Sequence, residues 1–111
     1  MPVLKYHREY EQAVRDGTKR QTIRRRGKVA AVGEPLHHQD HAGRPMRTDP
    51  CTGLRALAVI GTHEWILDGQ HIGIDQRNAI AQADGFENYC ACAKALRRIY
   101  GLPLDAQIIS W

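Results

Sequence analysis

A chain of 111 residues that is 42% hydrophobic and 25% charged has the length and composition of one folded domain over residues 1–111, which argues against a disordered chain. No apolar run approaches the roughly 20 residues of a membrane-spanning helix, and the first ten residues lack the apolar centre of a secretory signal, so we expect no membrane partner. Three cysteines, an odd number, do not form a disulfide framework, and we expect a reduced, cytoplasmic protein.

The net charge of +4 is concentrated near the N-terminus. Residues 1–28 hold nine of the sixteen Lys and Arg residues but three of the twelve Asp and Glu residues. Such an asymmetry is typical of a surface that faces a polyanion, and also of a solvated basic face. In the same segment, apolar side chains recur at helical spacing and predict a helix that ends before Gly17: Tyr6, Tyr10, Ala13 and Val14.

An extended segment is expected next over residues 21–26, with Ile23 as its apolar anchor. Gly33 and Pro35 mark a turn into a strand of about five residues. Residues 43–53 hold two Gly and two Pro, and we expect them to be mostly loop. Residues 54–66 are rich in aliphatic side chains and predict one long strand, bent near Gly61.

Asp68 and Gly69 stand between apolar runs and predict a β-hairpin. Asp75 is a suitable N-cap for a short helix over residues 76–83. A second helix follows Gly85, with a buried face that consists of Tyr89, Cys92, Ala93, Leu96 and Tyr100. Residues 106–111 form a last strand. This order of elements predicts a small α+β domain with a mixed or barrel-like sheet.

Lys19, Thr22 and Arg24 are candidates for chemistry. In an extended segment Thr22 and Arg24 share one face, while Lys19 lies nearer the preceding turn. A lysine within reach of a threonine hydroxyl can act as its base when burial or nearby cations lower the lysine pKa. Asp84 is either a turn carboxylate or an acid that faces Lys19 and Thr22 across a cleft, and its position in the sequence leaves both interpretations open.

His37, His38 and His41 have the close spacing of some metal ligands. Adjacent residues of a strand point to opposite faces, however, and no cysteine or carboxylate set of known zinc spacing completes the group. We therefore expect no metal there, and the role of these histidines stays open. The sequence also has no phosphate-binding or dinucleotide glycine motif, so we expect no cofactor of that kind. Its single serine, Ser110, lies in the last strand without a nucleophile motif, so we expect no serine hydrolase.

Four segments of the sequence, taken in order, resemble the ASCH domain family in the short form found in bacteria and phages. They are "GTKRQTIR", "VGEPL", "ADGFE" and "YGLPL" with the terminal "IISW". The resemblance covers nearly the whole chain. It implies a small β-barrel with flanking helices, related to the PUA domains of RNA-modifying enzymes. A fold of this kind hosts several functions.

The resemblance implies, first, a cleft that binds RNA or a nucleotide, and some family members are ribonucleases. In that case the basic residues would neutralise phosphates, Arg47 would border the cleft and Tyr89 would stack on a base. The basic residues are Arg24, Arg25, Arg26 and Lys28.

A distinct branch of the family removes the acetyl group from N4-acetylcytidine with a Lys, a Thr and a Glu. Lys19 and Thr22 match the first two, and Asp84 falls at the acidic position. This alternative needs no metal or cofactor. A third possibility is a phage or bacterial regulator that binds a protein partner. The partner is therefore RNA, a modified nucleoside or nucleotide, or a protein, and the oligomeric state is open.

Overall fold

The structure is a computed structural model that describes residues 2–27 and 30–111. It contains three helices: α1 (Arg8–Arg15), α2 (Ile74–Ala83) and α3 (Tyr89–Ile99). Its strands are β1 (Val3–Lys5), β2 (Gln21–Arg25), β3 (Pro35–Gln39), β4 (Pro45–Pro50), β5 (Gly53–Gly61), β6 (Glu64–Leu67), β7 (Gln70–Ile72) and β8 (Leu104–Ser110). The expected α+β class is confirmed.

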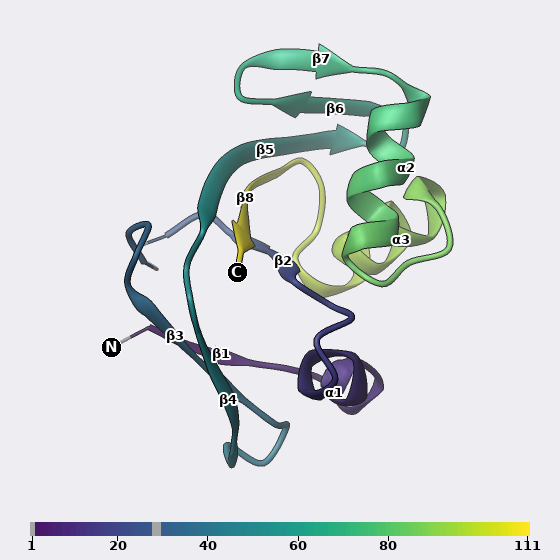
Figure 1. The fold of residues 1–111 in the computed structure, drawn as a ribbon. Coiled ribbons are helices and arrows are strands. Elements are labelled where there is room, and N and C mark those ends of the chain that lie inside the picture. The colour runs from purple at the N-terminus through teal and green to yellow at the C-terminus, as the bar shows by residue number, and fades with distance from the viewer. Residues whose placement is uncertain (1, 28–29) are drawn as a thin grey trace.

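The strands form two sheets (Figure 1). One contains three strands in the order β1-β3-β4, and the other contains five in the order β2-β8-β5-β6-β7. Among residues 2–27 and 30–111, no strand pairing joins the two sheets into a closed barrel. The β1–β3 pairing is parallel and all other pairings are antiparallel.

Two hydrophobic clusters hold the fold together. The larger lies between the five-stranded sheet and the helices α2 and α3, around Trp65 and Leu57. The smaller joins β1, α1 and β3 to the end of β8, around Leu36, Val14 and Trp111. Figure 1 shows α2 and α3 together beside the five-stranded sheet, whereas α1 lies near the three-stranded sheet. None of these helices is long and apolar enough to cross a membrane.

Several local expectations are confirmed. The helix before Gly17 forms as α1, and the hairpin at Asp68 and Gly69 joins β6 to β7 with φ values of 49° and 83°. Both values are positive, as a two-residue type I′ turn requires. Helix α3 begins after Asn88, whose side chain accepts a hydrogen bond from the Ala91 N–H, as an N-cap does.

Three expectations about elements are wrong, and one strand was missed. Residues 45–50 form strand β4 rather than loop, because the strand is at a sheet edge and its prolines occupy its ends. Residues 54–66 do not form one bent strand, since β5 turns after Gly61 and pairs with β6. Asp75 is not the N-cap of α2: the helix begins at Ile74, two residues earlier than expected, and its N-cap is Gly73. Strand β1, too short for a periodic pattern, was not expected.

Candidate active site

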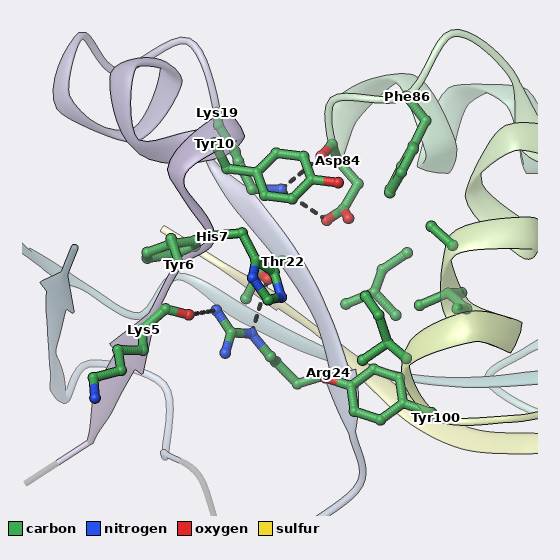
Figure 2. Close-up of a pocket in the computed structure, with 14 residues that line it drawn as sticks. Lys5, Tyr6, His7, Tyr10, Lys19, Thr22, Arg24, Asp84, Phe86 and Tyr100 are labelled. Carbon is green, nitrogen blue, oxygen red and sulfur yellow. Dashed lines mark hydrogen bonds and ion pairs between the residues drawn. The ribbon is translucent and has the colours of Figure 1, made fainter. Parts of the chain in front are cut away.

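The structure brings Lys19, Thr22 and Asp84 to one cleft (Figure 2). Lys19 lies between α1 and β2, where its backbone N–H donates to Ala13 at the end of α1. Thr22 lies on β2, and Asp84 is the C-cap of α2. All three side chains are buried although they are polar. Burial of polar groups costs free energy unless partners satisfy them, so their contacts define what the site can do.

Lys19 and Asp84 form a buried ion pair. Lys19 Nζ lies 3.1 Å from Asp84 Oδ1 and donates a hydrogen bond to the Asp84 backbone oxygen at 2.6 Å. The side chains of Lys19 and Asp84 are 4% and 10% exposed. Burial lowers the pKa of Lys19 and raises the pKa of Asp84, while their mutual attraction opposes both shifts. The two burial effects lower the free energy needed to move a proton from Lys19 to Asp84, which gives the neutral pair in which Lys19 carries a lone pair.

Arg24 holds the Thr22 hydroxyl. Its Nε donates to Thr22 Oγ1 at 3.0 Å, and its Nη2 donates to the Lys5 backbone oxygen at 2.7 Å. The guanidinium also lies over the ring of Tyr6, 5.0 Å from its centroid. Contacts to the end of β1 on one side and to β2 on the other fix the guanidinium, so Arg24 presents a positioned positive charge to Thr22.

We call this space the inner cleft, which occupies about 90 Å³. Besides Lys19, Thr22, Arg24 and Asp84, its walls include mainly aromatic and apolar side chains. Those drawn and labelled in Figure 2 are Tyr6, His7, Tyr10, Phe86 and Tyr100.

Tyr6, Tyr10 and Tyr100 were expected on buried helix faces, but Tyr6 precedes α1 and Tyr100 is the C-cap of α3. His7 and Phe86 were not expected at the site. The only local signal was that Tyr6, His7 and Tyr10 directly precede the basic segment. Sequence alone does not show that Phe86 and Tyr10 meet edge to face, with ring centroids 6.1 Å apart.

The other arginines of the basic segment lie outside the inner cleft. Arg25 donates from Nη2 to the Tyr100 backbone oxygen at 3.2 Å and covers the Tyr100 ring. Arg26 pairs with Asp105 at 3.8 Å, where both side chains are exposed. Lys28 lies outside the described residues. Arg24 therefore faces the cleft, whereas Arg25 and Arg26 lie on the exposed surface beside it.

Arg47 and Tyr89, the two remaining candidates, do not line the inner cleft. Arg47 donates two hydrogen bonds to the Asp49 carboxylate, at 2.7 and 2.8 Å, on the three-stranded sheet. Tyr89 is covered by the guanidinium of Arg77, 4.4 Å from its ring centroid, and its hydroxyl lies 2.9 Å from His63 Nδ1. With one face of its ring against Arg77, Tyr89 is a packing residue of the larger cluster in this arrangement.

The three clustered histidines have different surroundings. His38 is buried beside Tyr6 and Asp49. His41 belongs to a group with Glu11 and Asp40 whose ligand atoms lie within 4.8 Å of one another. Protein donors already occupy this group: Glu11 accepts from the His41 N–H, and Asp40 accepts from backbone N–H groups of its own turn. Hydrogen bonds within the protein therefore explain why these three side chains lie close together.

Comparisons with protein-family models, with curated proteins and with solved structures found no match to this chain.

Proposed function

We propose that this protein hydrolyses the amide of an N4-acylated cytidine, with Thr22 as nucleophile and Lys19 as its base. The observation that carries the proposal is the buried contact of Lys19 with Asp84 in the same cleft as an arginine-bound Thr22 hydroxyl. A lysine needs a lowered pKa to act as a base near neutral pH, and burial lowers the pKa of Lys19. The resemblance of the sequence to the ASCH family supports the same assignment.

The proposed reaction is acyl transfer to water in two steps. Thr22 Oγ1 attacks the acyl carbonyl while Lys19 accepts the hydroxyl proton, and the carbon–nitrogen bond breaks as that proton passes to the leaving amine of cytosine. Water then attacks the Thr22 ester, again with Lys19 as base. The carboxylate leaves, and the proton returns to the Thr22 oxygen.

Arg24 and Asp84 have supporting roles in this scheme. Arg24 already donates to Thr22 Oγ1, so it stabilises negative charge as that oxygen is deprotonated. Asp84 holds Lys19 through its carboxylate and its backbone oxygen, and it exchanges a proton with Lys19 without solvent. These groups are in place before substrate arrives, which lowers the reorganisation that the reaction needs.

Acetate release from N4-acetylcytidine tests the proposal. Thr22→Val removes the hydroxyl at similar volume and should lower kcat by about 100-fold or more, whereas Thr22→Ser should retain measurable turnover. Thr52→Val is the matched control, because Thr52 is an exposed threonine outside the cleft. Absence of acetate release by the wild-type protein, or full activity of Thr22→Val, contradicts the proposal.

A second candidate function is the binding of single-stranded RNA without hydrolysis of an acyl group. The exposed Arg25 and Arg26 beside the cleft favour it. Affinity should then fall as salt rises, by roughly 0.7 log unit per log unit of salt for each neutralised phosphate. Arg25→Ala with Arg26→Ala should flatten that slope, while Arg55→Ala with Arg97→Ala should not. Cleavage of the RNA in the same samples would add ribonuclease activity.

A further inference from the structure

The inner cleft is too small for a whole nucleoside. At about 90 Å³ it is smaller than the roughly 150 Å³ of a cavity that holds one benzene ring. It therefore accommodates the acylated edge of a base, next to Lys19 and Thr22, but not the attached sugar. The rest of a ligand must lie in a neighbouring space.

Such a space adjoins the inner cleft. We call it the outer hollow, and it occupies about 470 Å³, within the range of roughly 300–1,000 Å³ that is typical of small-molecule sites. Tyr10, Lys19, Phe86 and Ala95 line both spaces. Figure 2 shows Tyr10 and Phe86 near Asp84, and their rings meet edge to face with centroids 6.1 Å apart, so this pair stands where the two spaces adjoin.

The outer hollow presents charged groups that have no charged partner among residues 2–27 and 30–111. Lys94 and Arg98 lie one turn apart on α3, and both are exposed in its wall. Within residues 2–27 and 30–111 neither forms an ion pair. Two exposed carboxylates, Glu9 on α1 and Glu87 before α3, line the same hollow and are not paired with these cations.

We infer that the substrate is a nucleotide rather than a free nucleoside, with its phosphate held by Lys94 and Arg98 in the outer hollow. The inference rests on the proposed function, because it places the acylated base in the inner cleft. The sugar then lies against the edge-to-face pair of Tyr10 and Phe86, where the two spaces adjoin. A phosphate accepts charge-assisted hydrogen bonds from lysine and arginine, and carboxylates such as Glu9 and Glu87 accept hydrogen bonds from ribose hydroxyls. The ligand class is a pyrimidine nucleoside monophosphate.

Calorimetric binding of reaction products tests this inference without turnover. Cytidine, cytidine 5′-monophosphate and cytidine 3′-monophosphate are compared on the full chain. We expect one monophosphate to bind about tenfold or more tightly than cytidine, because charge-assisted hydrogen bonds are involved. Lys94→Ala with Arg98→Ala should remove that difference and leave the Kd of cytidine unchanged. Arg97→Ala is the matched control, since Arg97 lies on the same helix but outside the hollow.

The outcomes separate the two proposals. Equal affinity for cytidine and both monophosphates overturns the phosphate site, and so does a double variant that keeps the preference. If either of these results is obtained and the wild-type protein still releases acetate from N4-acetylcytidine, the phosphate site is rejected and the proposed function is retained. If no product binds and no acetate is released, both proposals fail. Circular dichroism of the double variant, with both substitutions at exposed positions, verifies that the fold is retained.

Discussion

His38 Nδ1 lies 2.9 Å from the Tyr6 hydroxyl, and the opposite nitrogen of the same ring lies 3.3 Å from Asp49 Oδ2. His38 is 1% exposed and also packs on Trp111, with ring centroids 4.4 Å apart. The Tyr6 ring in turn lies under Arg24, the residue that donates to Thr22. A buried polar chain thus connects the three-stranded sheet to the candidate active site.

Burial of His38 predicts a loss of stability at mildly acidic pH. Burial lowers its pKa from 6.5 to about 4, with Arg47 and Arg24 acting in the same direction and Asp49 opposing it. Between these two values the unfolded chain binds more protons, so the free energy of unfolding falls as the pH falls through this window. From pH 7 to pH 4.5 the contribution of His38 is about 2 kcal/mol.

Urea unfolding of wild type and His38→Asn at both pH values measures this contribution. Asparagine retains an acceptor for the Tyr6 hydroxyl but does not titrate, so the variant should lose about 2 kcal/mol less than wild type over the same interval. His37→Asn, at the adjacent position, should keep the wild-type pH dependence. Identical pH dependence in wild type and His38→Asn would show that burial does not perturb this histidine.

The Tyr6 hydroxyl should stabilise the fold more than the hydroxyl of Tyr100. Tyr6→Phe leaves His38 Nδ1 buried without a partner, which costs about 1–3 kcal/mol. The phenylalanine ring still lies under Arg24, so affinity for cytidine should stay within about twofold. Tyr100→Phe should change stability by less than about 0.5 kcal/mol, since no hydrogen bond of the Tyr100 hydroxyl occurs among the described residues. Thermal unfolding with parallel calorimetry gives both readouts, and equal stability of the two variants would argue against the buried contact.

Removal of Lys19 should destabilise the protein because Asp84 then stays buried without a partner. Lys19→Met leaves the buried Asp84 carboxylate without its cation, which costs about 3–5 kcal/mol. Addition of Asp84→Asn removes the unpaired charge and should recover a large part of that loss. Lys94→Met, at an exposed position of α3, should have little effect on stability.

A double-mutant cycle from urea unfolding at pH 7 measures this coupling. A coupling near zero between Lys19 and Asp84 would contradict the ion pair. The double variant also separates folding from catalysis, because we expect it to be folded and to have lost acetate release.

Arg24 should be more sensitive to a conservative change than Arg25. Lysine at position 24 keeps the charge but lacks the planar guanidinium that donates to Thr22 and to Lys5 simultaneously. We expect Arg24→Lys to lower kcat for acetate release by about tenfold to 100-fold, with a smaller effect on KM, because the contact acts on the developing charge of the nucleophile. Arg25→Lys, on the same strand but outside the cleft, should retain wild-type kcat. Similar kcat values for the two variants would remove Arg24 from the mechanism.

Several local features of this protein follow from its amino-acid sequence alone. Helical spacing before Gly17 predicted α1, and Asp68 with Gly69 predicted the hairpin, because turn geometry depends on the residues of the turn alone. The period of two along a strand placed Thr22 and Arg24 on one face, and the structure has them in direct contact. The α+β class followed from the order of helices and strands.

The contacts between distant residues depend instead on how the elements pack. Lys19 and Asp84 are separated by 65 positions, and their contact depends on how α2 packs beside β2. The same packing brings Phe86 to Tyr10 and encloses the inner cleft, whereas Tyr89 is directed into the larger hydrophobic cluster. Strand β4 likewise forms because β3 supplies a partner for residues that resemble a loop. Long-range contacts of this kind arise from burial of apolar surface, which depends on the whole chain rather than on any one segment.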